Sequence, residues 1–126
     1  MTDHSLRILV VEDEVIVSMT IEDMLGGLGH KVVAVARRLE AALELAREGD
    51  FDVAMLDINL HGEMSFPVAE LLTDRGVPFF FATGYGRLGM DSRYDGHQVL
   101  QKPFRISDIE EILQRLFPEG PARNVA

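Results

Sequence analysis

Apolar residues gather in five short runs along the 126-residue chain, separated by intervals with polar or helical patterns. The runs span about residues 7–11, 31–36, 52–56, 77–82 and 97–100. The fourth run is apolar at every position, as expected of a central strand that is buried on both faces of a parallel sheet. The pattern therefore predicts five strands, with the run from 77 to 82 as a central one.

The intervals between the runs predict helices. We expect helices over about 14–28, 39–48 and 66–75, and a last helix that begins at a capping box, Ser107–Glu110, and ends before Pro118. The interval from 84 to 96 carries four glycines, so we expect a short or fraying helix, or a loop, with high mobility. Five strands and five helices joined by right-handed crossovers predict an α/β, doubly wound, three-layer sandwich with strand order 2-1-3-4-5.

Composition narrows the range of functions. With 126 residues and 47% hydrophobic content, the chain forms one domain, which we place at residues 6–117 between a short extension, 1–5, and a tail, 118–126. A formal net charge of −9 disfavours binding to nucleic acid. The lack of cysteine fits a reducing compartment, and we identify no export signal and no membrane-spanning apolar stretch. We therefore expect a cytoplasmic protein that binds neither nucleic acid nor membrane.

Reactive polar residues follow four of the five runs. Glu12 and Asp13 follow the first run, Asp57 the third, Thr83 the fourth and Lys102 the fifth. Because the carboxyl ends of parallel strands meet at one edge of a sheet, the predicted strand order brings the three acids together. Converging carboxylates repel each other unless they share a cation, and these hard oxygen ligands suit Mg²⁺ or Mn²⁺.

The same residues include a nucleophile and the donors that it needs. Asp57 stands at a strand end in a short connection, where it can attack phosphorus and become an aspartyl phosphate. A transferring phosphoryl group needs cationic and donor partners at its oxygens. A divalent cation, the Lys102 ammonium and the Thr83 hydroxyl supply these partners, and Gly84 leaves its backbone N–H open to approach.

The chain resembles the receiver domain of bacterial two-component signalling, the CheY-like response regulators with a flavodoxin-like fold. The resemblance covers about residues 6–117, and it rests on the following residues in this order: Glu12–Asp13, Asp57, Thr83 and Lys102–Pro103–Phe104. The string from Phe81 to Gly86 also resembles a subgroup of stand-alone receivers that is named for its FATGY motif.

This resemblance implies specific roles. Asp57 would accept a phosphoryl group from a sensor histidine kinase or a histidine phosphotransfer protein. Asp13, Asp57 and the main-chain carbonyl of Asn59 would bind Mg²⁺, while Glu12 would act through a water molecule. Thr83, Gly84 and Lys102 would hold the phosphoryl oxygens. The Lys102–Pro103 peptide bond is expected to be cis, which is uncommon even before proline.

The sequence departs from the family pattern at two positions. Glu12 stands where aspartate is commoner, and its extra methylene still permits a water-mediated role. Val99 stands three residues before the lysine, where most receivers have a tyrosine or phenylalanine that swings inward on activation. We therefore predict that Tyr85, or the glycine-rich segment that contains it, carries the switch. His61 is interpreted as a solvated loop residue.

These observations favour a single-domain response regulator that works as a phosphorylation switch for a downstream protein target, or as a phosphate sink. It would catalyse its own phosphorylation and dephosphorylation and turn over no separate substrate. One alternative is an aspartyl-nucleophile phosphatase, but the second acid that such enzymes use is replaced by Asn59. A flavodoxin is disfavoured because residues 12–14 would repel the phosphate of FMN. A degenerate receiver that serves only as a docking module is disfavoured by the intact acids and Lys102.

Overall fold

The computed structural model describes residues 5–84 and 90–118 of the chain. In the described residues the elements follow in this order: β1 (Arg7–Val11), α1 (Val15–Gly27), β2 (Lys31–Ala36), α2 (Leu39–Glu48), β3 (Val53–Asp57), β4 (Asn59–Leu60), β5 (Glu63–Met64), α3 (Phe66–Arg75), β6 (Phe79–Thr83), the 3-10 helix η1 (Ser92–Tyr94), β7 (Val99–Gln101) and α4 (Ile106–Leu116).

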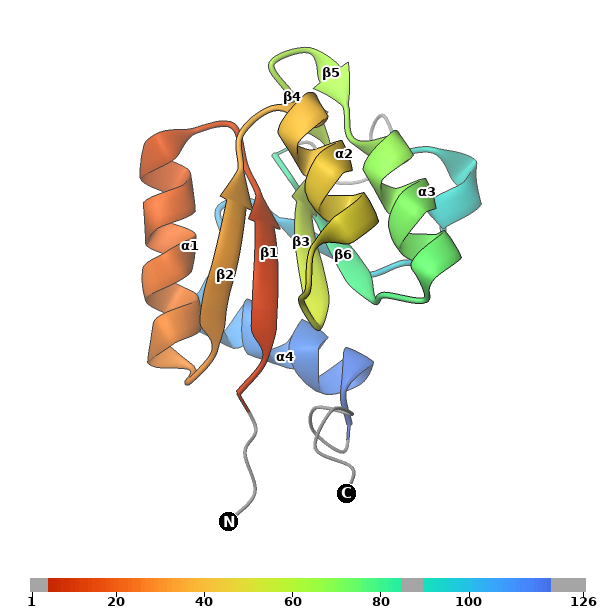
Figure 1. The fold of residues 1–126 in the computed structure, drawn as a ribbon. Coiled ribbons are helices and arrows are strands. Elements are labelled where there is room, and N and C mark those ends of the chain that lie inside the picture. Colours follow the sequence, from red (N-terminus) through yellow and green to blue (C-terminus); the bar gives the residue numbers. More distant parts are fainter. Residues whose placement is uncertain (1–4, 85–89, 119–126) are drawn as a thin grey trace.

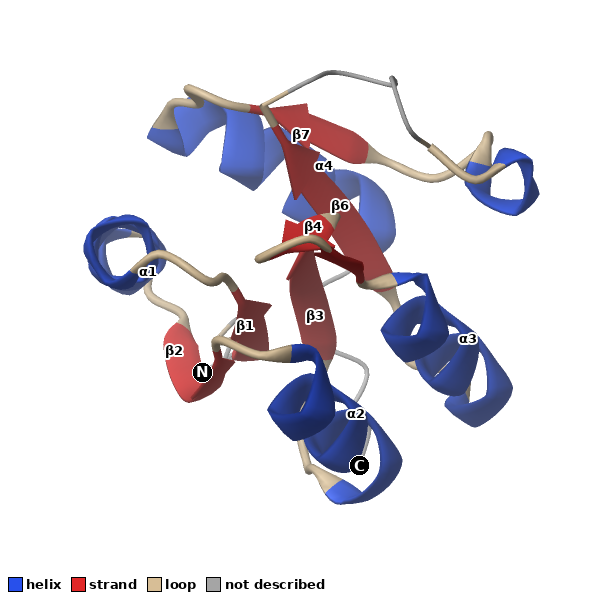
Figure 2. Cartoon of the chain, turned by 90° about the horizontal axis from the view of Figure 1, so that it is seen from above, coloured by secondary structure: helices blue, strands red, loops and turns tan. Residues whose placement is uncertain are grey.

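Five of the strands form one parallel sheet in the order β2-β1-β3-β6-β7. Since β6 and β7 are the fourth and fifth of these strands in the chain, the predicted order 2-1-3-4-5 is confirmed. Helices α1 and α4 cover one face of the sheet, and α2 and α3 cover the other (Figures 1 and 2). The fold is the expected three-layer α/β sandwich.

The two faces of the sheet pack into two separate apolar clusters, and β3 contributes to both. Val53 and Met55 pack with Ile21 of α1 and Ile109 of α4, on one side of the sheet. Ala54 and Leu56, which alternate with them along the strand, pack on the other side, against α2 and α3. Because both faces of the strand are covered, its side chains are apolar at successive positions instead of alternating with polar ones.

The connection between β6 and β7 differs from the expected five-helix pattern. Four α-helices occur in the described residues, and the described part of this connection holds only the short η1. Its Tyr94 is 5% exposed and stacks on Phe66, with ring centroids 5.8 Å apart and planes 7° apart. The ring also packs edge-on against Phe79 and Phe81 of β6. An aromatic cluster therefore covers this part of the sheet.

Two local predictions need correction. The last helix begins at Ile106, so Ser107 lies inside it, and the predicted capping box at Ser107–Glu110 is wrong. Instead, the Asp108 carboxylate accepts a hydrogen bond from the backbone N–H of Arg105 at 2.8 Å. The connection between Asp57 and the helix at 66–75, for which no strand was predicted, contains the antiparallel hairpin of β4 and β5.

Candidate functional site

The carboxyl ends of four parallel strands position the side chains that the sequence singled out. Asp57 and Thr83 are the last residues of β3 and β6, and β6 pairs with β3 on one edge and with β7 on the other. Glu12 follows β1 directly, and its N–H donates to the carbonyl oxygen of Ala36 at the end of β2. The strand register therefore fixes the positions of these groups along the strand direction, so that they meet at one edge of the sheet.

Three acids meet at this edge. One carboxylate oxygen from each of Glu12, Asp13 and Asp57 lies within 4.8 Å of the other two. Glu12 is 1% exposed and Asp57 is 8% exposed, so two of the three charges have little contact with water. The side chain of Asp13 is 14% exposed and lies on the more open side of the cluster.

Lys102 neutralises part of this charge. Its Nζ lies 2.8 Å from Glu12 Oε1 and 3.2 Å from Asp57 Oδ2, and it reaches the site from just beyond β7. The second oxygen of Glu12 accepts the N–H of Glu14 at 3.1 Å. The peptide bond between Lys102 and Pro103 is cis, as expected from the resemblance.

The donor set fits a divalent cation. Three carboxylates against one ammonium leave two negative charges uncompensated, and a single ion such as Mg²⁺ balances them. The oxygen ligands are hard, and no imidazole or thiolate belongs to the cluster among the described residues. Glu12, Asp13 and Asp57 are therefore the residues that would hold the metal.

The electrostatic environment shifts the ionisation of two of these groups. Burial raises the pKa of Asp57 to about 6; the Lys102 ammonium opposes the rise and the charge of Glu12 adds to it. Burial acts to lower the pKa of Lys102, but its hydrogen bonds with Glu12 and Asp57 outweigh this, so that its pKa is raised. The lysine therefore stays charged, and burial disfavours the charged form of Asp57.

The remaining predicted residues lie around this centre. Thr83 is 3% exposed and follows Ala82, which is paired with Asp57 across the sheet. Gly84 is exposed, and a side chain added there would meet nothing within 4 Å. Asn59 begins β4, and its side-chain oxygen accepts the N–H of Gly62 at 2.7 Å. Tyr85 lies outside the described residues.

His61 has a closer relation to the site than the sequence suggested. Its backbone N–H donates to Asp13 Oδ2 at 3.1 Å, and its ring Nδ1 lies 3.6 Å from the same oxygen. The His61 side chain is 67% exposed and therefore solvated, as predicted, but both its ring and its backbone N–H approach Asp13, so the residue is not a bystander. The adjacent Gly62 is the signal in the sequence that indicates a tight turn here.

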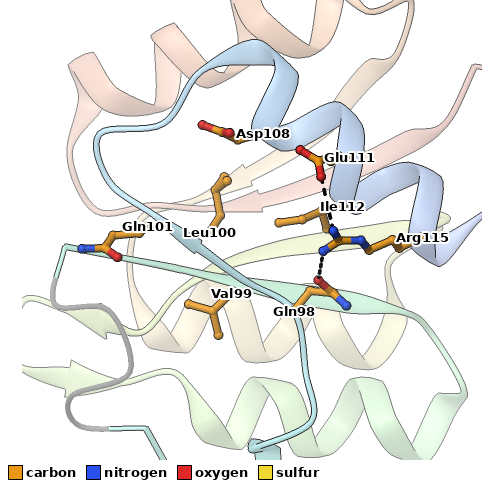
Figure 3. A pocket seen from close by; sticks show the side chains of 8 residues that line it. All are labelled: Gln98, Val99, Leu100, Gln101, Asp108, Glu111, Ile112 and Arg115. Atoms are coloured by element: carbon orange, nitrogen blue, oxygen red, sulfur yellow. Dashed lines mark hydrogen bonds and ion pairs between the residues drawn. The ribbon is translucent and has the colours of Figure 1, made fainter.

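A hollow of about 290 Å³ lies between β7 and α4, and none of the acids of the site lines it (Figure 3). Arg115 bridges it by bonding to Gln98 at 3.1 Å and to Glu111 at 3.2 Å. Figure 3 shows Leu100 pointing toward α4 and Val99 pointing the opposite way. Val99 packs there against the apolar cluster on the face of the sheet that α2 and α3 cover.

Comparison with known proteins places the chain in a family. Residues 8–114 match the response regulator receiver domain, and the chain belongs to that family. It is 41% identical to SdrG from Sphingomonas melonis Fr1, whose solution structure it matches with a TM-score of 0.81 over 93% of this chain and 99% of that one. The prediction of a receiver domain is confirmed, while membership of the FATGY subgroup stays a prediction.

Two further relatives bear on the function. The chain is 33% identical to the phyllosphere-induced regulator PhyR of Methylorubrum extorquens, over 96% of this chain and 47% of that protein. The receiver domain of the sensor histidine kinase PA1611 from Pseudomonas aeruginosa PAO1 has a magnesium ion in its active-site cleft; it is 25% identical, with a TM-score of 0.77 over 91% of this chain and 99% of that one. The chain spans about half, or less, of the length of the curated relatives that it matches.

Among the described helices, none has the length and apolar content needed to cross a membrane.

Proposed function

We propose that this receiver domain acts as a response regulator that is phosphorylated on Asp57. The observation that carries the proposal is the buried Asp57 carboxylate, which shares Lys102 with Glu12 inside a cluster of three acids. The donor is a phosphohistidine of a sensor kinase or a phosphotransfer protein. Its N–P bond breaks while a P–O bond to Asp57 forms, and the imidazole keeps the electron pair and is reprotonated by solvent.

The surrounding residues bind and orient the reacting groups. Glu12, Asp13, Asp57 and the main-chain carbonyl of Asn59 would hold Mg²⁺, or alternatively Mn²⁺. The bound cation would neutralise charge on the phosphoryl oxygens. Lys102 then exchanges a carboxylate partner for a phosphoryl oxygen, and the hydroxyl of Thr83 and the N–H of Gly84 donate to the same group.

Phosphorylation turns a single negative charge into roughly two and adds three acceptor oxygens. Lys102 and Thr83 reorganise around the new group, which changes the affinity for a downstream protein or only removes phosphate from the kinase. The chain turns over no separate metabolite. Because Val99 carries no ring, Tyr85 and the residues that follow it take over the coupling. Amide exchange of residues 84–96 that stays the same after phosphorylation would contradict this assignment.

Phosphotransfer assays test the central step. Purified histidine kinases and phosphotransfer proteins carrying labelled phosphate should transfer it to the parent protein in the presence of Mg²⁺, and the product should be labile to base. The Asp57→Asn variant should remain unlabelled, with its fold checked by circular dichroism. Label that persists in this variant, or a parent protein that accepts phosphate from neither these donors nor a small acyl phosphate, would refute the proposal.

Exposed apolar side chains suggest where the donor docks. Five of the six large apolar residues that are exposed in the described structure follow closely on a site residue in the chain: Val15, Ile16, Met19, Met64 and Ile106. Ile16 is 80% exposed in the first turn of α1, just after Asp13. Since the phosphohistidine must reach Asp57, its carrier covers this part of the surface.

A pair of matched variants tests the docking surface. Ile16→Ser should slow phosphoryl transfer from the protein donor by roughly tenfold. The reason is that the complex loses half or more of the free energy gained by burying one isoleucine side chain. Transfer from a small acyl phosphate should not change. Val33→Ser is the control, since Val33 is also exposed but lies within β2. Equal effects of the two substitutions would place the donor elsewhere.

A further inference from the structure

The tight turn at the tip of the β4–β5 hairpin has an unusual backbone. Its two central residues, His61 and Gly62, both have positive φ, at 52° and 89°. Such a two-residue turn matches the twist of the flanking strands. Glycine adopts this conformation freely, but a histidine does so at a cost in free energy. Contacts of the hairpin with the rest of the protein therefore have to hold the turn in place.

The hairpin is held at both of its ends. At its base, the N–H of Ser65 donates to the carbonyl of Ile58 at 2.8 Å, and Leu60 is buried in the core. At its tip, Asn59 Oδ1 accepts the N–H of Gly62. These contacts leave the N–H of His61 directed at the neighbouring connection, where it donates to Asp13 Oδ2 at 3.1 Å.

Asp13 differs from the other two acids in how it is held. Lys102 bonds to Glu12 and to Asp57, and a backbone N–H fixes the second oxygen of Glu12. The hydrogen bond that reaches Asp13 from a distant segment comes from His61, 48 positions along the chain. A carboxylate with one oxygen anchored presents the other in a defined direction. The orientation of Asp13 therefore depends on the turn.

We propose that the His61–Gly62 turn positions Asp13 for the divalent cation, so that cation affinity depends on two residues whose side chains supply no ligand. This inference rests on the proposed function, in which Asp13 is a ligand of Mg²⁺. The backbone N–H of His61 is the positioning group. The left-handed conformation of the turn is what directs it at Asp13.

Glycine substitutions test this inference without steric clash. At Gly62 an added Cβ would meet nothing within 4 Å, so the main effect of Gly62→Val is strain in the backbone of the turn, where φ is 89°. Gly29 is a matched control: its φ is 88°, an added Cβ there also meets nothing within 4 Å, and it lies between α1 and β2, at the opposite end of the sheet (Figure 1). The two variants carry the same kind of strain at different distances from the acids.

Titration with Mg²⁺ alone, followed by amide chemical shifts of Asp13 and Asp57, gives the affinity. We expect Gly62→Val to bind about tenfold more weakly, the factor associated with loss of a hydrogen bond to a charged group, and Gly29→Val to bind like the parent. Gly62→Asn should recover part of the affinity, because asparagine tolerates positive φ. Unchanged affinity in Gly62→Val, or an equal loss in Gly29→Val, would overturn the inference while leaving the metal site intact. A parent protein that does not bind Mg²⁺ would overturn the proposed function as well.

Amide exchange gives a second test that needs no change in the turn. The His61 amide should be protected from exchange in the metal-free parent and should lose this protection in Asp13→Ala, whereas the amides within β3 should keep theirs. Protection of the His61 amide that survives in Asp13→Ala would show that Asp13 does not receive this hydrogen bond, and the inference would fail.

Discussion

The connections that follow Asp57 and Thr83 leave neighbouring strands at the same edge of the sheet, but different forces hold them. The first is a hairpin tied down by hydrogen bonds, and its tip contacts Asp13. The described part of the second is held by aromatic packing, through the ring of Tyr94 against α3 and β6. The comparison indicates that the first connection serves the charged site, whereas the ring of Tyr94, in the described part of the second, contributes chiefly to the stability of the core.

Removal of the buried ring is expected to have the largest effect on stability. Tyr94→Ala should lower the free energy of unfolding by about 3 to 5 kcal/mol, because it leaves a cavity beside Phe66 and Phe81. The affinity for Mg²⁺ should stay within about twofold of the parent, and Tyr94→Phe should be nearly as stable as the parent. Urea denaturation measures the first quantity. A large loss of cation affinity in Tyr94→Ala would remove the distinction between the two connections.

Asp57→Asn should have the opposite effect on stability. The pKa of Asp57 is raised from 3.8 to about 6 in the folded protein, so the folded state binds more protons than the unfolded chain between these values. Stability of the metal-free protein should therefore fall as the pH rises from about 4 to 6. Above pH 7 the ionised carboxylate costs roughly 3 kcal/mol, at about 1.4 kcal/mol for each unit by which the pKa is raised, and the asparagine removes this cost.

Denaturation at pH 4 and at pH 7.5 in the presence of a chelator measures this difference. The parent and Asp57→Asn should be similar at pH 4, and the variant should be more stable at pH 7.5. A variant that is less stable than the parent at pH 7.5 would mean that Lys102 more than compensates for the burial of the carboxylate. The acids and Lys102 of the site would then stabilise the fold, as the aromatic cluster does.

The smallest effect is expected from the polar contacts of the second connection. Arg93 pairs with Glu70 of α3 at 3.3 Å, but both side chains are 54% exposed. Because solvent screens such pairs, Glu70→Ala should leave the urea midpoint unchanged within error. A clear loss of stability would mean that charge as well as ring packing holds η1 against α3.

The sequence predicted the sheet and the acidic cluster because both depend on patterns that span many residues. Strands buried on both faces require uninterrupted apolar runs. The strand order then fixes where the polar residues that end these runs lie in space. Once Asp57 was placed at the end of the third run, its proximity to Glu12 and Asp13 followed from topology alone.

The features that escaped prediction are short or depend on tertiary contacts. β4 and β5 have two residues each, too few to show an alternating pattern, and the positive φ of His61 leaves no mark in its residue type. Tyr94 stands among polar residues, and only packing against α3 shows that its ring belongs to the core. The cap of α4 involves Asp108 and a backbone N–H, and its position could not be read from residue types alone.

Strand β3 is buried at all five positions, with β1 on one edge and β6 on the other. In the proposed reaction, an element enclosed on every side has little freedom to shift when a bulky acyl phosphate forms at its last residue. The acceptor carboxylate therefore stays nearly stationary, and the adjustment falls on the segments that approach it from the neighbouring strands. Any conformational change that follows the proposed phosphorylation is therefore expected in the segments that follow the neighbouring strands, and not in β3 itself.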